Sequence, residues 1–155
     1  MHQRFTLPAQ TTPLPGESRV PEFRRLGWNA LPDLQYVMPV PAEISGQRYL
    51  SLATFRKTGV AVYTPVWFAE EAGKIYFMTN AKLGKVKRIR NNPQVKIAPC
   101  TMRGKITGPE FPATARILPP EDSERVRRAI RAKYWLARLP FLWRNSNTFI
   151  EITPA

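Results

Sequence analysis

The sequence predicts a mainly β domain of the α+β class, in which six antiparallel strands form a small barrel flanked by two helices. Apolar residues occur in short runs separated by turns that contain glycine or proline. Only two segments have helical spacing, and they do not alternate with strands as a parallel sheet requires. The domain is expected to extend over residues 43–155, an ordinary length for one small domain.

The first strands are expected to form an antiparallel meander over residues 49–55, 60–69 and 74–79. Strong β formers fill these runs, and Gly59 stands in the first turn, where a positive φ is needed. Pro65 interrupts the second strand. A proline inside a strand marks an edge or a bulge, because it lacks the N–H of the ladder. The backbone next to it would be open to a ligand.

In the next segment the spacing of apolar residues changes from that of a strand to that of a helix. Val86 and Ile89 lie three residues apart among basic residues, which predicts a short amphipathic helix over 84–90. Further strands are expected over 94–98, 113–118 and 148–152. Before the last of them, a second helix is expected to begin near Pro119 and to end at Pro140. Its apolar stripe would consist of Val126, Ile130, Tyr134 and Leu136.

Residues 1–42 differ from the rest of the chain. Prolines stand at positions 8, 13, 15, 21, 32, 39 and 41, and no helical or strand period survives between them. Each proline restricts itself and its predecessor to extended or turn geometry. We therefore expect a mostly extended N-terminal arm.

Composition excludes several chemistries. The formal charge of +13, from 24 Lys and Arg against 11 Asp and Glu, favours anionic partners such as phosphorylated cofactors, nucleic acid or acidic surfaces. Cys100 is the only cysteine and His2 the only histidine, so a Cys/His zinc site or a His-based catalytic pair is not expected. No apolar run reaches the roughly 20 residues of a membrane span or resembles a signal peptide, so we expect a cytoplasmic protein.

A candidate phosphate site lies between Thr79 and Arg88. A strand ends in a hydroxyl residue, Gly84 follows, and a basic helix begins. Backbone N–H groups at a helix start, the helix dipole and nearby Lys or Arg side chains favour phosphate. The spacing is not that of a nucleotide P-loop. A solvated basic helix face is the alternative.

A candidate ring-binding segment comprises Thr64, Pro65, Val66 and Trp67. Free backbone groups around Pro65 would bond the edge of a heterocycle, while Val66 and Trp67 would pack against the ring. The alternative is a core strand with an edge proline.

Two other features have simpler interpretations. Cys100 has no plausible base near it in the sequence, so we expect a buried structural cysteine. The basic run from Arg125 to Trp135 would suit phosphates of nucleic acid, but a solvated helix face is the preferred interpretation. The pattern of an RNA-binding sheet is not evident.

Together these segments resemble the pyridoxamine 5′-phosphate oxidase-like (PPOX-class) split barrels, above all the branch of deazaflavin (coenzyme F420)-dependent oxidoreductases. The resemblance covers about residues 43–155. Its motifs are YLSLATF at 49–55, TPVWF at 64–68, GKVKRIR at 84–90, NP at 92–93, APC at 98–100, Gly104 with TGP at 107–109, and EITPA at 151–155.

The resemblance implies an FMN-binding type of split barrel that forms a homodimer with two cofactor sites at the subunit interface. It implies that Lys85 and Arg88 contact the cofactor phosphate, aided by Thr79 and the backbone near Gly84. The segment Thr64–Trp67 would lie along the isoalloxazine ring, with Thr54 close by. Leu83 departs from the family, since many relatives carry a polar or basic residue there. Lys82, Lys85 and Lys87 would compensate for it.

The implied activity is hydride transfer from reduced coenzyme F420 to an electron-poor organic substrate. The cofactor carries the hydride and the protein orients it, so no catalytic side chain is expected. The positive charge favours F420, with its phosphate and acidic tail, over FMN. A protein that binds a flavin, F420 or a tetrapyrrole without turnover is the alternative. A nucleic-acid-binding domain is less favoured.

Overall fold

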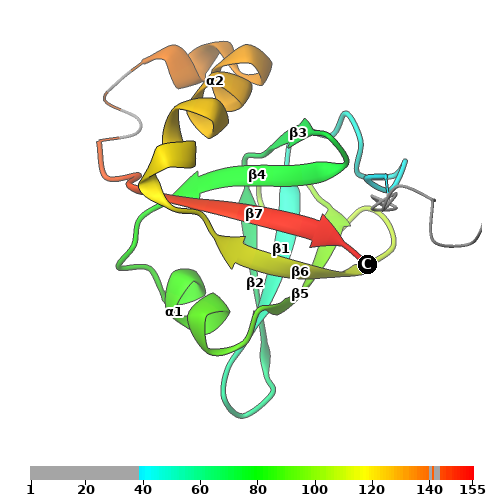
Figure 1. Ribbon diagram of the computed structural model, residues 1–155. Helices are drawn as coiled ribbons and strands as arrows, with labels where there is room; N and C mark the ends of the chain where they lie inside the picture. Colours follow the sequence, from blue (N-terminus) through cyan, green and yellow to red (C-terminus); the bar gives the residue numbers. More distant parts are fainter. Residues whose placement is uncertain (1–38, 140, 142–143) are drawn as a thin grey trace, which may run out of the picture. The chain divides into compact units, whose positions relative to one another are not determined.

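Seven strands form one antiparallel sheet in the computed structural model, which describes residues 39–139, 141 and 144–155 (Figure 1). Their order across the sheet is β2-β1-β5-β6-β7-β4-β3. The strands are β1 (Leu50–Phe55), β2 (Ala61–Val66), β3 (Ala69–Glu71), β4 (Lys74–Thr79), β5 (Gln94–Pro99), β6 (Phe111–Ile117) and β7 (Thr148–Pro154). The helical elements are α1 (Gly84–Asn91), α2 (Ser123–Lys133) and the 3₁₀ turns η2 (Pro120–Asp122) and η3 (Trp135–Arg138).

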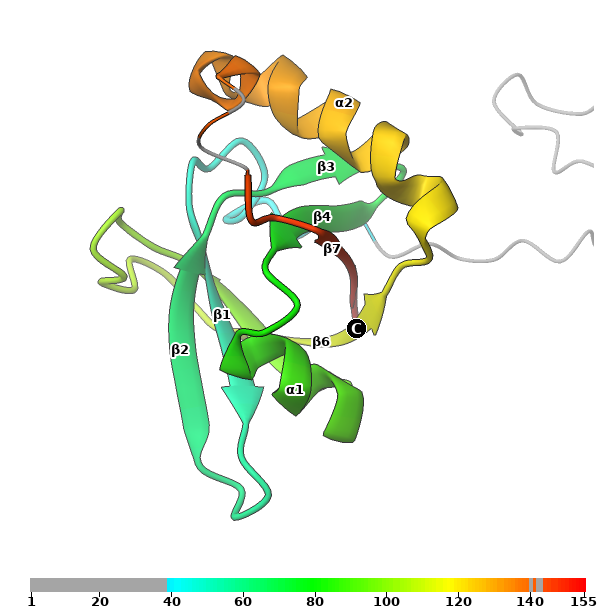
Figure 2. The same ribbon diagram turned by 90° about the vertical axis from the view of Figure 1, so that its left-hand side faces the viewer.

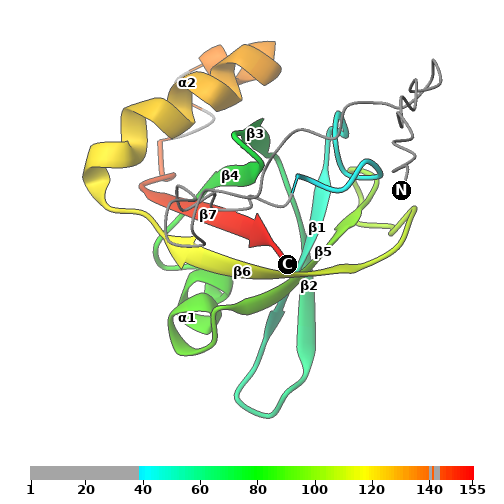
Figure 3. The ribbon, with the colours of Figure 1, turned by 45° about the vertical axis from the view of Figure 1, so that its right-hand side comes forward.

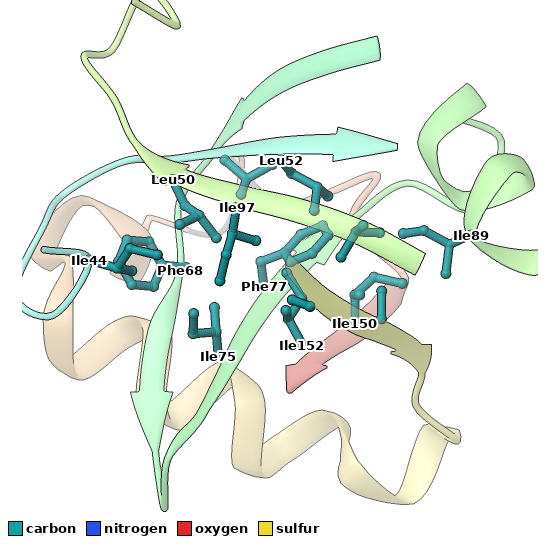
Figure 4. Packing of buried hydrophobic residues seen from close by; sticks show 14 residues of the cluster. Ile44, Leu50, Leu52, Phe68, Ile75, Phe77, Ile89, Ile97, Ile150 and Ile152 are labelled. Atoms are coloured by element: carbon teal, nitrogen blue, oxygen red, sulfur yellow. The ribbon is translucent and has the colours of Figure 1, made fainter. Parts of the chain in front are cut away.

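The sheet curls around a shared interior and forms a split β-barrel (Figure 2). Strand alternation explains this, because each strand places every second side chain inside. In β5, for example, Val95 and Ile97 are buried while Gln94 and Lys96 are exposed. Leu50, Leu52, Phe68, Ile75, Phe77, Ile97, Ile150 and Ile152 fill the core (Figure 4). The predicted mainly β barrel with two helices is therefore confirmed.

The strand count is a correction, because the strand expected over 60–69 divides into β2 and β3. β2 pairs with β1, whereas β3 pairs with β4, so Trp67 and Phe68 cross between two parts of the sheet. The backbone N–H of Phe68 donates to the Tyr134 hydroxyl at 3.2 Å. A side chain from a distant segment thus replaces a strand partner at the break, and no local sequence pattern predicts this contact.

The expected meander is also wrong. β4 does pair with β3, but its other neighbour is β7, and it does not pair with β2. The C-terminal strand β7 lies between β6 and β4, so the chain end completes the sheet. Gly59, by contrast, adopts φ +84° in the β1–β2 turn, as expected.

The two helices lie at opposite ends of the barrel (Figures 1 and 2). α1 packs near β1 and β6 and buries Val86 and Ile89, which confirms the predicted amphipathic helix. α2 covers β3 and β4 with Val126 and Ile130 (Figure 3). Among the described residues, no helix is both long and apolar enough to cross a membrane.

α2 ends earlier than the sequence predicts. Tyr134 leaves helical geometry at φ −121° and ψ 109°, and Leu136 is 38 % exposed, so it does not continue the buried stripe. The hydroxyl of Tyr134 bonds the backbone of Phe68 in the β2–β3 connection, at the point where the chain leaves the helix. Pro140 lies outside the described residues, as do residues 1–38 of the predicted arm. Val40, near the C-terminal end of the predicted arm, is partly buried and packs against the core.

Candidate functional site

The connection from β4 to α1 is held in place by two amide side chains. β4 ends at the buried Thr79, which lies opposite Thr148 of β7. The Oδ1 atom of Asn147 accepts a hydrogen bond from Ala81 N at 3.0 Å, and Asn80 Oδ1 accepts one from Lys82 N at 2.8 Å. These bonds fix the loop that leads into the helix.

The N-terminus of α1 carries no side-chain cap. Leu83 is the N-cap residue, its backbone is extended, and its side chain is 46 % exposed and makes no cap hydrogen bond. The first turn also contains no acidic residue. The first N–H groups of a helix need partners from outside it, and together with the helix dipole they favour an anion. Leu83 thus leaves this helix end without a side-chain partner.

Two cations meet beside that helix end. Lys85 and Arg88 are three residues apart on α1, so they lie on neighbouring positions of one face. Arg88 Nε donates a hydrogen bond of 2.8 Å to Oγ1 of Thr54, which is buried in β1. Partial burial lowers the pKa of Lys85, and the positive charge of Arg88 lowers it further. An anion bound here would offset the cost of the charged lysine.

Gly84 leaves space for the Arg88 guanidinium. A Cβ atom placed on Gly84 would lie 2.8 Å from Arg88 Nη1. We call Thr54, Gly84, Lys85 and Arg88 the α1 seat. Of the site residues expected from the sequence, these four come together. Lys87 does not join them, because it lies on the exposed side of α1, away from the buried Val86 and Ile89.

Strand β2 runs beside Thr54 at an edge of the sheet. Thr54 lies opposite Val62, and Thr64 lies opposite Leu52, so Val62 and Thr64 share the face of these β1 residues. Among the described strands β2 pairs only with β1, so its outer edge is not covered by another strand. Pro65, exposed, stands in this edge strand, as predicted. The side chain of Val66 belongs to the barrel core.

Trp67 lies at the other end of β1 and β2. Its ring stacks on Tyr134, with centroids 4.9 Å apart and planes inclined by 10°. The two rings line a pocket of about 290 Å³. The other lining residues are Gly46, Arg48, Tyr49, Lys133, Trp135 and Leu136, and we call this the aromatic pocket. Tyr49 is five residues from Thr54, so the pocket is about 16 Å from the α1 seat along β1.

The aromatic pocket is not evident from local sequence patterns. Its residues come from the segment before β1, from the β2–β3 connection, from the end of α2 and from η3. Helical spacing predicts Tyr134 in a buried stripe, and nothing in the sequence relates it to Trp67. The one sequence feature that points to the pocket is the aromatic pair Tyr134 and Trp135 directly after a basic helix.

Cys100 is buried, and burial raises the pKa of its thiol. A raised pKa disfavours the nucleophilic thiolate, so the expected structural cysteine is supported. Within the described residues no group of three or more His, Cys, Asp or Glu is placed to hold a metal ion.

The curled sheet and its topology define a split barrel of the PPOX class. The family model of pyridoxamine 5′-phosphate oxidase matches residues 40–155. The chain therefore belongs to the pyridoxamine 5′-phosphate oxidase family, as the sequence resemblance implied. No curated protein is significantly similar to it.

Solved structures share this fold at low sequence identity. A protein described as an F420 reductase is 18 % identical, with a TM-score of 0.54, and the match covers 75 % of this chain and 93 % of that one. The conserved hypothetical protein Rv2991 from Mycobacterium tuberculosis is 22 % identical over 74 % of this chain and 83 % of that one, with a TM-score of 0.52. The heme storage protein HutZ from Vibrio cholerae is 14 % identical over 71 % and 83 %, with a TM-score of 0.56.

Proposed function

We propose that the protein binds a flavin or deazaflavin through a phosphate in the α1 seat and acts as an oxidoreductase. The observation that carries this proposal is the meeting of an uncapped helix N-terminus with Lys85 and Arg88. The family match supports a flavin-type cofactor in general terms.

The residues of the α1 seat fit a phosphate. The guanidinium of Arg88 is a planar fork suited to phosphate oxygens, and Thr54 holds it in place through Nε. A phosphate would offset the unfavourable partial burial of Lys85. Leu83 offers no polar contact, so the backbone N–H groups of α1 and the neighbouring Lys82 and Lys87 would take that part.

The bound cofactor would supply hydride, and the chain would orient it and shield it from water. In our proposal the ring lies along the uncovered edge of β2 at Thr64 and Pro65, with Trp67 beyond it. Val66 would contribute backbone groups only, because its side chain lies in the barrel core and not against the ring as the sequence predicted. The aromatic pocket is the candidate place for an electron-poor organic substrate. We also propose a homodimer with the cofactor sites at its interface. A net charge of +13 favours F420, with its acidic tail, over FMN.

Titration with F420 and with FMN, followed through ring fluorescence, tests the proposal. We expect Lys85→Ala and Arg88→Ala each to weaken binding by about tenfold or more, because each removes a charge-assisted contact. Arg90→Ala is the matched control, since Arg90 is an exposed cation in the last turn of the same helix. Absence of binding to both cofactors would overturn the proposal. Equal effects of all three variants would reject the α1 seat.

A binding protein without turnover is the second candidate, because the heme storage protein HutZ shares the fold. Anaerobic reoxidation of excess reduced cofactor by a quinone or a conjugated enone separates the two functions. Catalytic turnover beyond one equivalent supports an oxidoreductase, whereas tight binding without reoxidation supports storage.

A further inference from the structure

The outer side of α2 carries a cluster of arginines. α2 lies over β3 and β4 (Figure 2). It buries Val126 and Ile130, so Arg128 and Arg131 stand on its remaining surface. Both are exposed, and together with Arg138 of η3 and Ala132 they line one shallow hollow. Three arginines from two consecutive elements therefore line a single hollow.

These three arginines differ from the other cations of the segment. Ser123 to Arg138 contains six basic residues and one acidic residue. Arg125 pairs with Glu71, Arg127 with Glu124 and Lys133 with Glu70. In the described part of the chain, no carboxylate lies within ion-pair distance of Arg128, Arg131 or Arg138. Their charge is thus available to a partner.

Apolar side chains adjoin the arginines. Trp135 is 71 % exposed, and it is three residues before Arg138 in a 3₁₀ turn, where side chains at that spacing lie above one another. Trp135, which also lines the aromatic pocket, therefore stands on the same side of this turn as Arg138. Leu136, Leu139 and Phe141 are 38 %, 37 % and 65 % exposed in the same short segment. We call Arg128, Arg131, Trp135, Arg138 and Phe141 the basic–aromatic patch.

We propose that the basic–aromatic patch docks the protein on the surface of an anionic lipid bilayer. Arginine forks bind lipid phosphates, and tryptophan rings are suited to the boundary between head groups and acyl chains. Nucleic acid would use the arginines as well, but it has no place for exposed leucines beside them. Lipid accounts for both the charge and the apolar side chains.

Sedimentation of the full-length protein with vesicles tests the proposal. We expect binding to phosphatidylcholine vesicles that contain phosphatidylglycerol, little binding to phosphatidylcholine alone, and weaker binding at high salt. The triple variant R128A/R131A/R138A is expected to lower the partition coefficient on the order of 100-fold, at about fivefold for each charge. Trp135→Ser is expected to weaken the binding that survives at high salt.

A charge-matched control separates the patch from the net charge. Lys57, Arg103 and Lys105 are exposed in loops away from α2, so K57A/R103A/K105A makes the same change in charge elsewhere. The partition coefficient of this control variant is expected to stay within a few-fold of that of the unaltered protein. Circular dichroism and thermal unfolding check that each variant is folded.

Three outcomes would overturn the proposal. The first is no binding to anionic vesicles, and the second is an equal loss in both triple variants. The third is binding of a fluorescent DNA duplex that is tighter than vesicle binding and is lost only in R128A/R131A/R138A. That result would assign the patch to nucleic acid.

Discussion

The Arg88 guanidinium donates through Nε to the Thr54 hydroxyl at 2.8 Å, and this bond ties α1 to β1. Thr54 Oγ1 is also 3.5 Å from the Val62 carbonyl oxygen of the edge strand β2. A single hydroxyl thus connects the helix that would hold a phosphate with the strand that would face a ring. The relationship makes the orientation of Arg88 depend on β1.

Thr54→Val keeps the shape of the side chain and removes the acceptor. Arg88 Nε then loses its partner in a partly buried place, so we expect a loss of about 1 kcal/mol in the free energy of unfolding. Cofactor affinity should fall several-fold because Arg88 is no longer held. Urea unfolding and fluorescence titration measure the two effects. Thr54→Ser keeps the hydroxyl and should retain affinity. An unchanged affinity in Thr54→Val would show that this bond does not position Arg88 for binding.

Gly84→Ala should separate stability from binding. The new Cβ would come within 2.8 Å of Arg88 Nη1, and the flexible guanidinium can move away from it. Because alanine is the better helix former, we expect the free energy of unfolding to stay the same or to rise by up to about 1 kcal/mol. Phosphate-dependent affinity should fall, since Arg88 is displaced. A variant that binds the cofactor as tightly as the unaltered protein would argue against the proposed position of Arg88.

Lys85→Met tests whether the α1 seat is maintained at a cost to stability. The folded-state pKa of Lys85 lies below its ordinary 10.5, so the unfolded chain binds this proton more tightly. The charged lysine therefore destabilises the fold at neutral pH, and that penalty disappears as the pH rises through the folded-state pKa towards 10.5. Lys85→Met should unfold at higher urea concentration at pH 7 and bind the cofactor more weakly. If Lys85→Met unfolded at a lower urea concentration than the unaltered protein at pH 7, the charged lysine would not destabilise the fold.

Glu151 is buried and is the centre of an ionic group whose two cations are partly exposed. Its Oε1 atom lies 3.1 Å from Lys74 Nζ and 3.0 Å from Arg116 Nη2, and Tyr76 donates to Oε2 at 3.2 Å. Burial by itself would raise the pKa of Glu151, but the hydrogen bonds and charges of Lys74 and Arg116 outweigh burial and lower it. The ionised carboxylate therefore stabilises the fold above the unfolded-state pKa of about 4.5, and this contribution is lost as the pH falls through the folded-state pKa.

Glu151→Gln should lower the free energy of unfolding at pH 7 by about 1–3 kcal/mol, because two cations lose their partner. The variant should also lose part of the acid sensitivity, so the difference from the unaltered protein should shrink below pH 4. Urea unfolding at a series of pH values measures this. A difference that is constant from pH 7 to pH 3 would mean that the fold does not lower the pKa of Glu151.

Tyr134→Phe keeps the ring that stacks on Trp67 and removes its hydroxyl. The backbone N–H of Phe68 then has no acceptor at the break between β2 and β3. We therefore expect the free energy of unfolding to fall by about 1–3 kcal/mol. Burial raises the pKa of Tyr134 to about 12, so the unaltered protein should lose stability as the pH rises from the unfolded value of 10.0 towards 12. Tyr134→Phe should lack this alkaline loss. Thermal unfolding at pH 7 and pH 11 checks both points.

Local patterns were sufficient where a single element controls its own structure. The three-residue spacing of Val86 and Ile89 predicted α1, and both residues are buried. Alternation predicted β5, and Gly59 adopts the positive φ that its turn requires. In each case hydrophobic period or backbone freedom is a property of a few consecutive residues, so it can be read without the rest of the chain.

Long-range contacts were not accessible in this way. Tyr134 is 66 residues from Phe68, yet its hydroxyl bonds the Phe68 backbone between β2 and β3, immediately after the end of α2. For the same reason the sequence predicted one strand too few and missed the aromatic pocket.

Composition and local period alone established a small basic antiparallel barrel and placed Gly84, Lys85 and Arg88 at a helix start. The tertiary structure decided that Thr54 holds Arg88, that β7 closes the sheet beside β4, and that Trp67 faces Tyr134. The physical reason is that helical and strand periods depend on neighbouring residues, whereas the partner of a hydroxyl or a ring depends on how distant segments pack.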